Sequence, residues 1–286
     1  MLYPNPITAG NTVIVADSSA DLPEITKVPF RSAPLKIITK NKEYIDDPAL
    51  NVAEMVNDLA RYKGKSSTSC PNPDEWLTAF GDAEHVFCVT ITATLSGSFN
   101  AAMSAKKIYE EEHPGRRVFV LNSLSAGPEC ALLVEKIEEL VAAGKTFEEI
   151  CAETVAYQLK TGLVFILESL KNLANNGRVS PLVAKAAGLL GIRLVGKASD
   201  KGDLEPLDKV RGFDKALETL FNRMKELGSQ GGKIRIAHCF NEEAAQKLKA
   251  MILREFEKAK VEIHKCHGLC SFYAEKGGML VGFEKA

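Results

Sequence analysis

Three segments rich in serine and threonine hold the side chains best suited to binding a small ligand. They are residues 65–73, 90–98 and 122–128. Hydroxyl groups and backbone N–H groups at the start of a helix favour an anion, because the donors and the helix dipole both face it. The segments therefore indicate a carboxylate or phosphate site. The interpretation that they only cap helices and form turns stays equally open.

None of these serines has the sequence surroundings of a catalytic nucleophile. Ser96 stands in Leu-Ser-Gly rather than in a Gly-x-Ser-x-Gly elbow, and no histidine or aspartate falls at a spacing that would complete a triad. The phosphate-binding motif Gly-x-x-x-x-Gly-Lys-Ser/Thr is also absent from the sequence. We therefore expect a binding protein that is not an enzyme.

Two other classes of protein remain as alternatives. A small-molecule phosphotransferase or hydrolase could use the same anion-binding segments, with Asp17 holding Mg²⁺ at the end of a predicted strand. A turn-capping role beside Ser18 and Ser19 is favoured for Asp17. The third class is an interaction module without a ligand, which an empty polar interior would support.

The seven cysteines are scattered, and in a reducing compartment they are mostly small buried side chains. His264, Cys266, His267 and Cys270 form the one cluster that resembles a set of zinc ligands. A structural zinc site usually presents two regularly spaced pairs, and this segment has no second pair. We therefore expect no metal ion and no cofactor.

The first half of the chain alternates strand and helix patterns that would position the three polar segments. Strands are expected at residues 12–17, 34–39, 85–91 and 117–121, and helices at residues 51–62, 98–112 and 131–143. This alternation predicts a mainly parallel sheet with helices on its faces. Ligands bind at the carboxyl ends of such strands, where residues 90–98 and 122–128 begin.

The second half shows hairpin signals and ends in a strand. Strands are expected at residues 163–167, 188–195, 203–211, 233–238, 261–264 and 278–284, and long helices at residues 213–227 and 242–256. This pattern predicts a mixed sheet. We therefore expect two α/β domains, residues 1–160 with the three polar segments and residues 161–286 with the mixed sheet.

Charge and hydropathy exclude two kinds of partner. The formal net charge is −1, and acidic and basic residues are interspersed, so no basic stripe indicates nucleic-acid binding. The most apolar stretches have the length of strands, well short of a membrane span. Residues 1–10 lack the apolar core of a signal peptide, so a cytoplasmic location is expected.

Five short segments together resemble the DegV family of bacterial proteins. They are Val-Ala-Asp-Ser-Ser-Ala-Asp-Leu-Pro at 15–23, Thr-Ser-Cys-Pro-Asn at 68–72, Leu-Ser-Gly-Ser-Phe-Asn-Ala-Ala at 95–102, Leu-Lys-Asn-Leu-Ala-Asn-Asn-Gly-Arg-Val-Ser at 170–180 and Val-Arg-Gly at 210–212. Each match is modest, but all of them follow the order of the family.

The resemblance implies two α/β domains that hold a long-chain fatty acid and present it to a separate kinase subunit. That subunit would make acyl phosphate for phospholipid synthesis. Carried over by motif, the groups that hold the carboxylate are Thr68, Ser69, Ser96 and Gly97, with Arg178 near the head group. The acyl tunnel, in residues 161–286, would include Phe165, Ile166, Leu189, Ile192 and Phe272. For any single one of these residues, packing in the plain core is the favoured interpretation.

One segment departs from the family pattern. Family members commonly carry His-x-Gly-Pro-Gly near the head group, whereas this chain has Lys-Cys-His-Gly-Leu at 265–269. If Gly268 takes the place of the first glycine, Cys266 stands where the histidine belongs. His267 follows one residue later, and it is the remaining candidate for a carboxylate contact from this segment.

Overall fold

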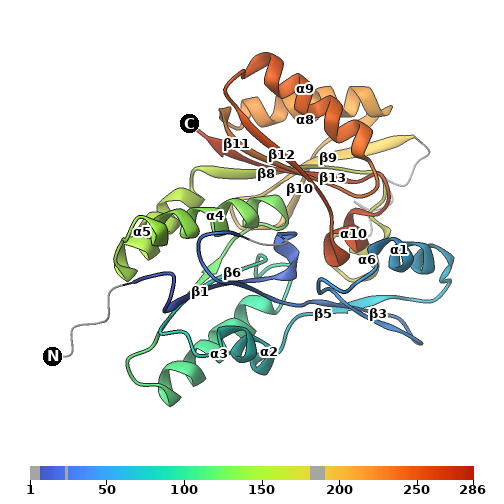
Figure 1. The fold of residues 1–286 in the computed structure, drawn as a ribbon. Helices are drawn as coiled ribbons and strands as arrows, with labels where there is room; N and C mark the ends of the chain where they lie inside the picture. The colour runs from blue at the N-terminus through green and yellow to red at the C-terminus, as the bar shows by residue number, and fades with distance from the viewer. Residues whose placement is uncertain (1–6, 23–24, 181–190) are drawn as a thin grey trace.

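A four-stranded parallel sheet forms the centre of the N-terminal half of the chain (Figure 1). The computed structural model describes residues 7–22, 25–180 and 191–286. The strand order is β2-β1-β6-β7, and neighbouring strands all run parallel. Every residue of β1 and β6 is buried, as expected for parallel strands covered on both faces. The strands are β1 (Thr12–Asp17), β2 (Phe30–Ala33), β6 (His85–Thr90) and β7 (Arg117–Asn122).

Helices cover both faces of this sheet. Trp76 and Phe80 pack on one face, and Ile137 and Ile150 pack on the other. Capping boxes fix the first residues of α2 and α5. The expected helix at residues 98–112 is present with those bounds. The four helices are α2 (Pro73–Phe80), α3 (Ser98–Glu112), α4 (Pro128–Ala142) and α5 (Phe147–Gln158).

A three-stranded antiparallel sheet with the order β4-β3-β5 lies beside the parallel sheet (Figure 1). Residues 65–73, expected to be a loop, contain its edge strand, because Ser67–Ser69 pair with β3. A strand of three polar residues has no apolar alternation that would reveal it in a sequence. The strands are β3 (Lys36–Ile38), β4 (Glu43–Ile45) and β5 (Ser67–Ser69), and they pack against α1 (Val52–Arg61).

A six-stranded mixed sheet contains the strands that follow residue 160 in the described part of the chain. Its order is β10-β9-β8-β13-β11-β12, and of its described pairs β11 with β12 is parallel and the others are antiparallel. The strands are β8 (Thr161–Leu167), β9 (Ile192–Ala198), β10 (Leu204–Arg211), β11 (Ser229–His238), β12 (Lys260–Lys265) and β13 (Met279–Lys285).

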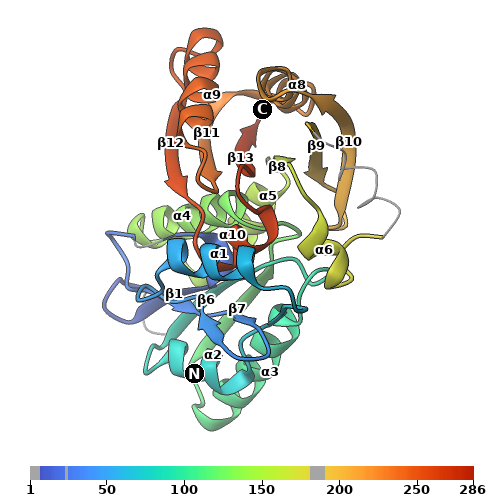
Figure 2. The same ribbon diagram turned by 90° about the vertical axis from the view of Figure 1, so that its right-hand side faces the viewer.

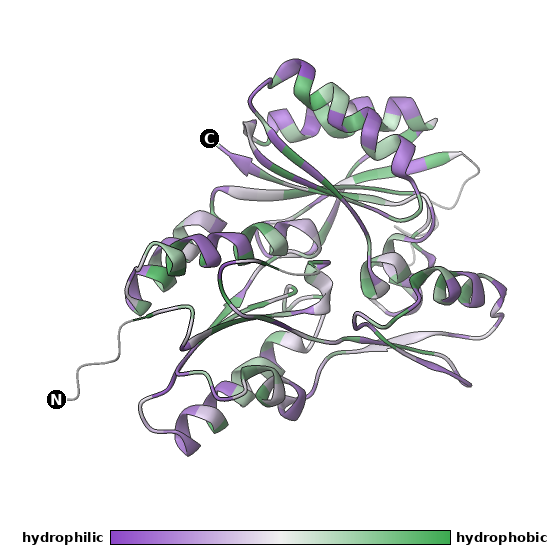
Figure 3. Cartoon of the chain, in the orientation of Figure 1, coloured by the Kyte–Doolittle hydropathy of each residue, from purple (hydrophilic) through white to green (hydrophobic). Residues whose placement is uncertain are grey.

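The two faces of the mixed sheet have different neighbours (Figure 2). Helices α8 (Phe213–Glu226) and α9 (Glu242–Glu255) cover the outer face, with their hydrophobic sides toward the strands (Figure 3). The inner face meets α4, where the carboxylate of Glu135 binds the Arg235 guanidinium at 2.6 and 2.7 Å. The short helices α6 (Lys171–Asn175) and α10 (Gly268–Ala274) also lie on this side.

The predicted fold class is confirmed, because the first sheet is parallel and the second is mixed. The boundary near residue 160 stays a prediction. No helix in the described ranges is long and apolar enough to cross a membrane.

Candidate functional site

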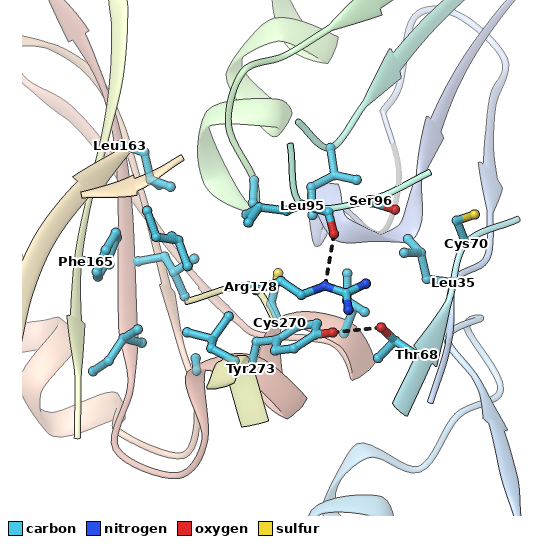
Figure 4. A pocket seen from close by; sticks show the side chains of 18 of the residues that line it. Leu35, Thr68, Cys70, Leu95, Ser96, Leu163, Phe165, Arg178, Cys270 and Tyr273 are labelled. Atoms are coloured by element: carbon cyan, nitrogen blue, oxygen red, sulfur yellow. Dashed lines mark hydrogen bonds between the residues drawn. The ribbon is translucent and has the colours of Figure 1, made fainter. Parts of the chain in front are cut away.

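A cavity of about 260 Å³ lies between the N-terminal half and the inner face of the mixed sheet (Figure 4). Its wall is mostly apolar, with hydroxyl groups and one guanidinium at the side that faces β5. The described residues that line it are Leu35, Thr68, Ser69, Cys70, Ile91, Leu95, Ser96, Gly97, Ala126, Leu163, Phe165, Leu167, Leu173, Arg178, Leu204, Leu269, Cys270, Tyr273, Ala274 and Leu280.

The polar groups come from three separate segments that the fold brings together. Thr68 lies on β5, Ser96 lies in the loop between β6 and α3, and Arg178 follows α6. The Thr68 Oγ1 and Tyr273 Oη atoms are 2.7 Å apart and share a hydrogen bond. The Nε of Arg178 donates to the carbonyl oxygen of Leu95 at 3.1 Å (Figure 4). These bonds hold a hydroxyl and a cationic group at the same end of the cavity.

Gly97 allows the loop before α3 to approach β5 closely. A Cβ atom at Gly97 would lie 3.1 Å from the Sγ of Cys70, tighter than an ordinary contact. Gly97 is also the N-cap residue of α3 and has no side chain that could cap the helix, whereas the Ser96 hydroxyl accepts from the Ser98 N–H at 3.2 Å. The loop therefore presents the Ser96 hydroxyl and the positive end of α3 beside Thr68 and Ser69.

Asp17 holds the loop between β6 and α3 through buried hydrogen bonds. It ends β1 and is buried, and its Oδ2 accepts from the Ile91 N–H at 2.9 Å and the Ser98 hydroxyl at 2.5 Å. Its Oδ1 accepts from the Ser19 hydroxyl at 2.5 Å. Burial raises the pKa of the Asp17 carboxyl, and these hydrogen bonds oppose that shift. Asp17 therefore positions both ends of the Ser96 loop.

The apolar end of the cavity is built by alternate residues of β8. Leu163, Phe165 and Leu167 face the cavity, and Leu280 of the neighbouring strand β13 lies opposite Phe165. Ile166 points to the other face of the sheet, into the core beneath α8 and α9. Side chains alternate along a strand, so consecutive residues of β8 cannot share one face.

Three residues predicted for the acyl tunnel do not line the cavity, and a fourth lies outside the described residues. Ile166 is excluded from the cavity by the alternation of β8. Phe272 lies on α10 but packs with Ile37 and Met55 in the core beneath α1. Ile192 begins β9, is half-buried and is not among the lining residues. Leu189 lies outside the described residues.

His267 lines a separate cavity of about 310 Å³ together with Asp21 and Asp46. The imidazole Nδ1 of His267 bonds the Asp46 carboxylate, and the backbone N–H of His267 donates to Asp21 Oδ1 at 3.0 Å. Asp46 also accepts from the N–H groups of Gly268 at 2.7 Å and Leu269 at 2.9 Å, so it caps α10. The structure thus places His267 away from the hydroxyl groups of the first cavity.

The second cavity contains a buried carboxyl group, that of Asp21, whose pKa is raised. Desolvation, with Asp46 as the next cause, raises the pKa of Asp21 to about 7. The Asp21 Oδ2 is enclosed and has no hydrogen-bond partner in the described structure. The hydrogen bond to Asp46 raises the pKa of His267, and burial opposes this change.

In the described ranges, no group of three or more His, Cys, Asp and Glu side chains is arranged to hold a metal ion.

Several lining residues were not anticipated from the sequence. Leu269 and Tyr273 are four residues apart on α10 and present one face of that short helix to the cavity. Leu280 comes from the last strand, and Leu173 comes from α6. Two apolar residues four apart on a seven-residue helix are weak evidence for a helix face in a sequence. Only the tertiary structure shows that they line the same cavity as β8.

Comparisons with known proteins agree with this architecture. A curated DegV domain-containing protein of Streptococcus pneumoniae is 43% identical over 275 residues, covering 95% of this chain and 98% of the relative. A solved structure of a DegV family protein from Eubacterium eligens, loaded with heptadecanoic acid, is 44% identical with a TM-score of 0.94. It covers 96% of this chain and 100% of that one.

A second solved structure is the fatty acid kinase (Fak) B3 protein of S. pneumoniae, loaded with linoleic acid. It is 42% identical, has a TM-score of 0.95, and covers 96% of this chain and 100% of that chain. Structural relatives of this chain therefore bind fatty acids. The family model described as "uncharacterised protein, DegV family" matches residues 11–286. With the fold, the motifs and these matches in agreement, the chain belongs to the DegV family.

Proposed function

We propose that this protein binds a long-chain fatty acid and presents its carboxylate to a separate kinase subunit, without catalysing a reaction itself. The observation that carries the proposal is the lining of the cavity, with hydroxyl groups and a guanidinium at one end and leucine and phenylalanine side chains along the rest. The fatty acids bound by two relatives of above 40% identity support it.

The carboxylate would lie among Thr68, Ser69, Ser96 and Arg178. A buried carboxylate needs several donors, because its desolvation otherwise cancels much of the gain from burial. The hydroxyl groups, the Gly97 N–H and the guanidinium offer these donors, and a charge-assisted hydrogen bond is stronger than a neutral one. His267 is left out of this set, since it lines the other cavity.

The acyl chain would extend along Leu163, Phe165, Leu167 and Leu280. Burial of a chain of about 16 carbons contributes about 12 kcal/mol, at about 0.8 kcal/mol per methylene. Association and ordering oppose binding by about 4–15 kcal/mol. The tail alone therefore gives a modest net affinity, and the polar end decides whether an acid or a neutral lipid is preferred.

The chemistry of the cavity and the name of one relative support a kinase partner. Gly97 is exposed while the acyl end of the cavity is buried, so a second protein could reach the carboxylate without extracting the tail. Transfer of a phosphoryl group from ATP to the carboxylate would give acyl phosphate and ADP. The S. pneumoniae relative is named as a fatty acid kinase protein, which supports this role. A cytoplasmic location, where ATP is available, fits the proposal.

Equilibrium binding measurements test the proposal with three ligands of equal chain length. We expect a free fatty acid to bind at least tenfold more tightly than its methyl ester or its alcohol, because only the acid carries the charge for Arg178. Equal affinity for all three would mean that the polar end does not recognise a carboxylate. The presentation of the acid to a kinase is tested by mixing the protein with a purified kinase subunit, ATP and a fatty acid. We expect acyl phosphate from the mixture and none from either protein alone.

A further inference from the structure

We propose that Phe165, positioned by Gly196, sets the length of acyl chain that the cavity accepts; this inference rests on the proposed function. Phe165 lies in the middle of the inner face of the mixed sheet and is 2% exposed. It lines the cavity on the side away from Thr68 and Cys70 (Figure 4). A straight tail that starts among the hydroxyl groups would therefore run toward the phenyl ring.

The phenyl ring is held in place by the strand beside it. Phe165 is the direct partner of Leu280 on one side and of Gly196 on the other, and Gly196 is in turn opposite Pro206. A Cβ atom at Gly196 would lie 2.4 Å from Cζ and 2.5 Å from Cε2 of Phe165. The ring therefore occupies the space above the glycine, as aromatic residues do over glycines in sheets.

A second, much smaller void lies next to the main cavity. Its volume is about 10 Å³, and it shares Phe165, Leu167 and Leu204 with the main cavity. Its other described lining residues are Leu170, Val179, Leu194 and Pro206, which are all apolar. Phe165, Leu167 and Leu204 therefore form the wall between the space for the tail and this void, and the phenyl ring is the largest side chain of that wall.

The side chains around the void would select acids by chain length rather than by polarity. All the named side chains around the void are hydrocarbon, so a longer tail meets no desolvation cost there. A phenyl ring is rigid and has few rotamers, so it yields less easily than a leucine. A terminal methyl group that reaches the ring must displace it, whereas a shorter chain fits without movement.

Three variants test the gauge with a series of saturated acids of about 14 to 20 carbons. Phe165→Leu should open the wall between the main cavity and the void, so the preferred chain length should increase. Each further methylene that fits should tighten binding about fourfold. Phe165→Trp should shift the preference toward shorter acids. Leu194→Ala is the matched control, because Leu194 lines the void but not the main cavity, and it should leave the preferred length unchanged.

The outcomes separate this inference from the proposed function. If the wild type binds fatty acids and both Phe165 variants keep its length preference, the gauge is wrong and the binding function stands. A wild type that binds none of the acids overturns the proposed function. A shift in Leu194→Ala as large as that in Phe165→Leu would contradict the inference, because it would locate the limit in the void rather than at the ring.

Discussion

The hydroxyl groups of Thr68 and Tyr273, 205 residues apart in the chain, share a hydrogen bond of 2.7 Å at the cavity. The bond joins β5 of the small antiparallel sheet to α10, which lies against the mixed sheet. Burial raises the pKa of the Tyr273 hydroxyl, with the bond to Thr68 acting against that change, so this group stays protonated near neutral pH. One end of the cavity is thus a link between the two halves of the chain.

Tyr273→Phe removes this link without changing the shape of the ring. We expect the free energy of unfolding to fall by about 1 kcal/mol, the usual net contribution of one hydrogen bond. Fatty-acid affinity should fall as well, because the Thr68 hydroxyl loses its orienting partner. Thermal unfolding and acid binding measure the two effects. An unchanged melting temperature would show that the hydrogen bond does not stabilise the folded protein.

Ser96→Ala tests the residue at the centre of the polar end. A hydrogen bond to a charged acceptor contributes about 1.5–3 kcal/mol, so affinity should weaken by about 10- to 150-fold. The Ser96 hydroxyl also accepts from the Ser98 N–H at 3.2 Å, so a small loss of stability is expected. Ser104→Ala, on the exposed side of the following helix α3, is the control. A lowered melting temperature with unchanged affinity would identify Ser96 as a structural residue only.

Arg178→Lys tests whether geometry as well as charge is needed. Lysine keeps the positive charge but cannot reproduce the planar guanidinium, whose Nε bonds the Leu95 carbonyl. We expect Arg178→Met to weaken acid binding by about tenfold or more, and Arg178→Lys to lie between it and the wild type. Titration with a fatty acid at two salt concentrations checks this order. If Arg178→Met binds like the wild type, the guanidinium does not contact the carboxylate.

Asp21→Asn should change how stability depends on pH. Asp21 has a pKa near 3.8 in the unfolded chain and about 7 when folded, chiefly because of burial. Below about pH 4 Asp21 is protonated in both states and does not affect stability. Between about pH 4 and pH 7 the free energy of unfolding falls, because the unfolded chain ionises more readily than the folded one, and above about pH 7 this loss is complete. The variant should match the wild type at about pH 4 and exceed it above pH 7, by up to about 4 kcal/mol.

The substitution suits this position because Asp21 has a φ of 52°, a left-handed conformation that asparagine tolerates. Asparagine also keeps an oxygen that can accept from the His267 N–H. Asp200→Asn, at an exposed turn, provides the control for the loss of a charge. If the free energies of unfolding of Asp21→Asn and the wild type differ by the same amount at every pH in this range, the pKa of Asp21 is not raised on folding.

The sequence was most informative where periodicity was strong. The long helix α3 and the buried strands β1 and β6 have continuous patterns, and their predicted bounds agree with the structure to within a residue or two. The apolar run at residues 163–167 identified β8 but not which of its residues face the cavity. Both faces of that strand are buried, so Phe165 and Ile166 look alike in sequence.

Other parts of the site depend on contacts that no local pattern reveals. The position of Thr68 depends on pairing between β5 and β3, which are separated in the chain by β4 and α1. His267 carries the right chemistry for a head-group contact, yet its imidazole bonds Asp46 and the residue lines another cavity.

The central claim is that the cavity holds a fatty acid, and mass spectrometry of the intact protein tests it most directly. Protein purified from bacteria should carry an additional mass that matches one fatty acid of about 14 to 18 carbons, and organic extraction should release the same acid. Delipidated protein should regain that mass when the acid is added. A protein that carries no acid and takes up none of those added would contradict the account.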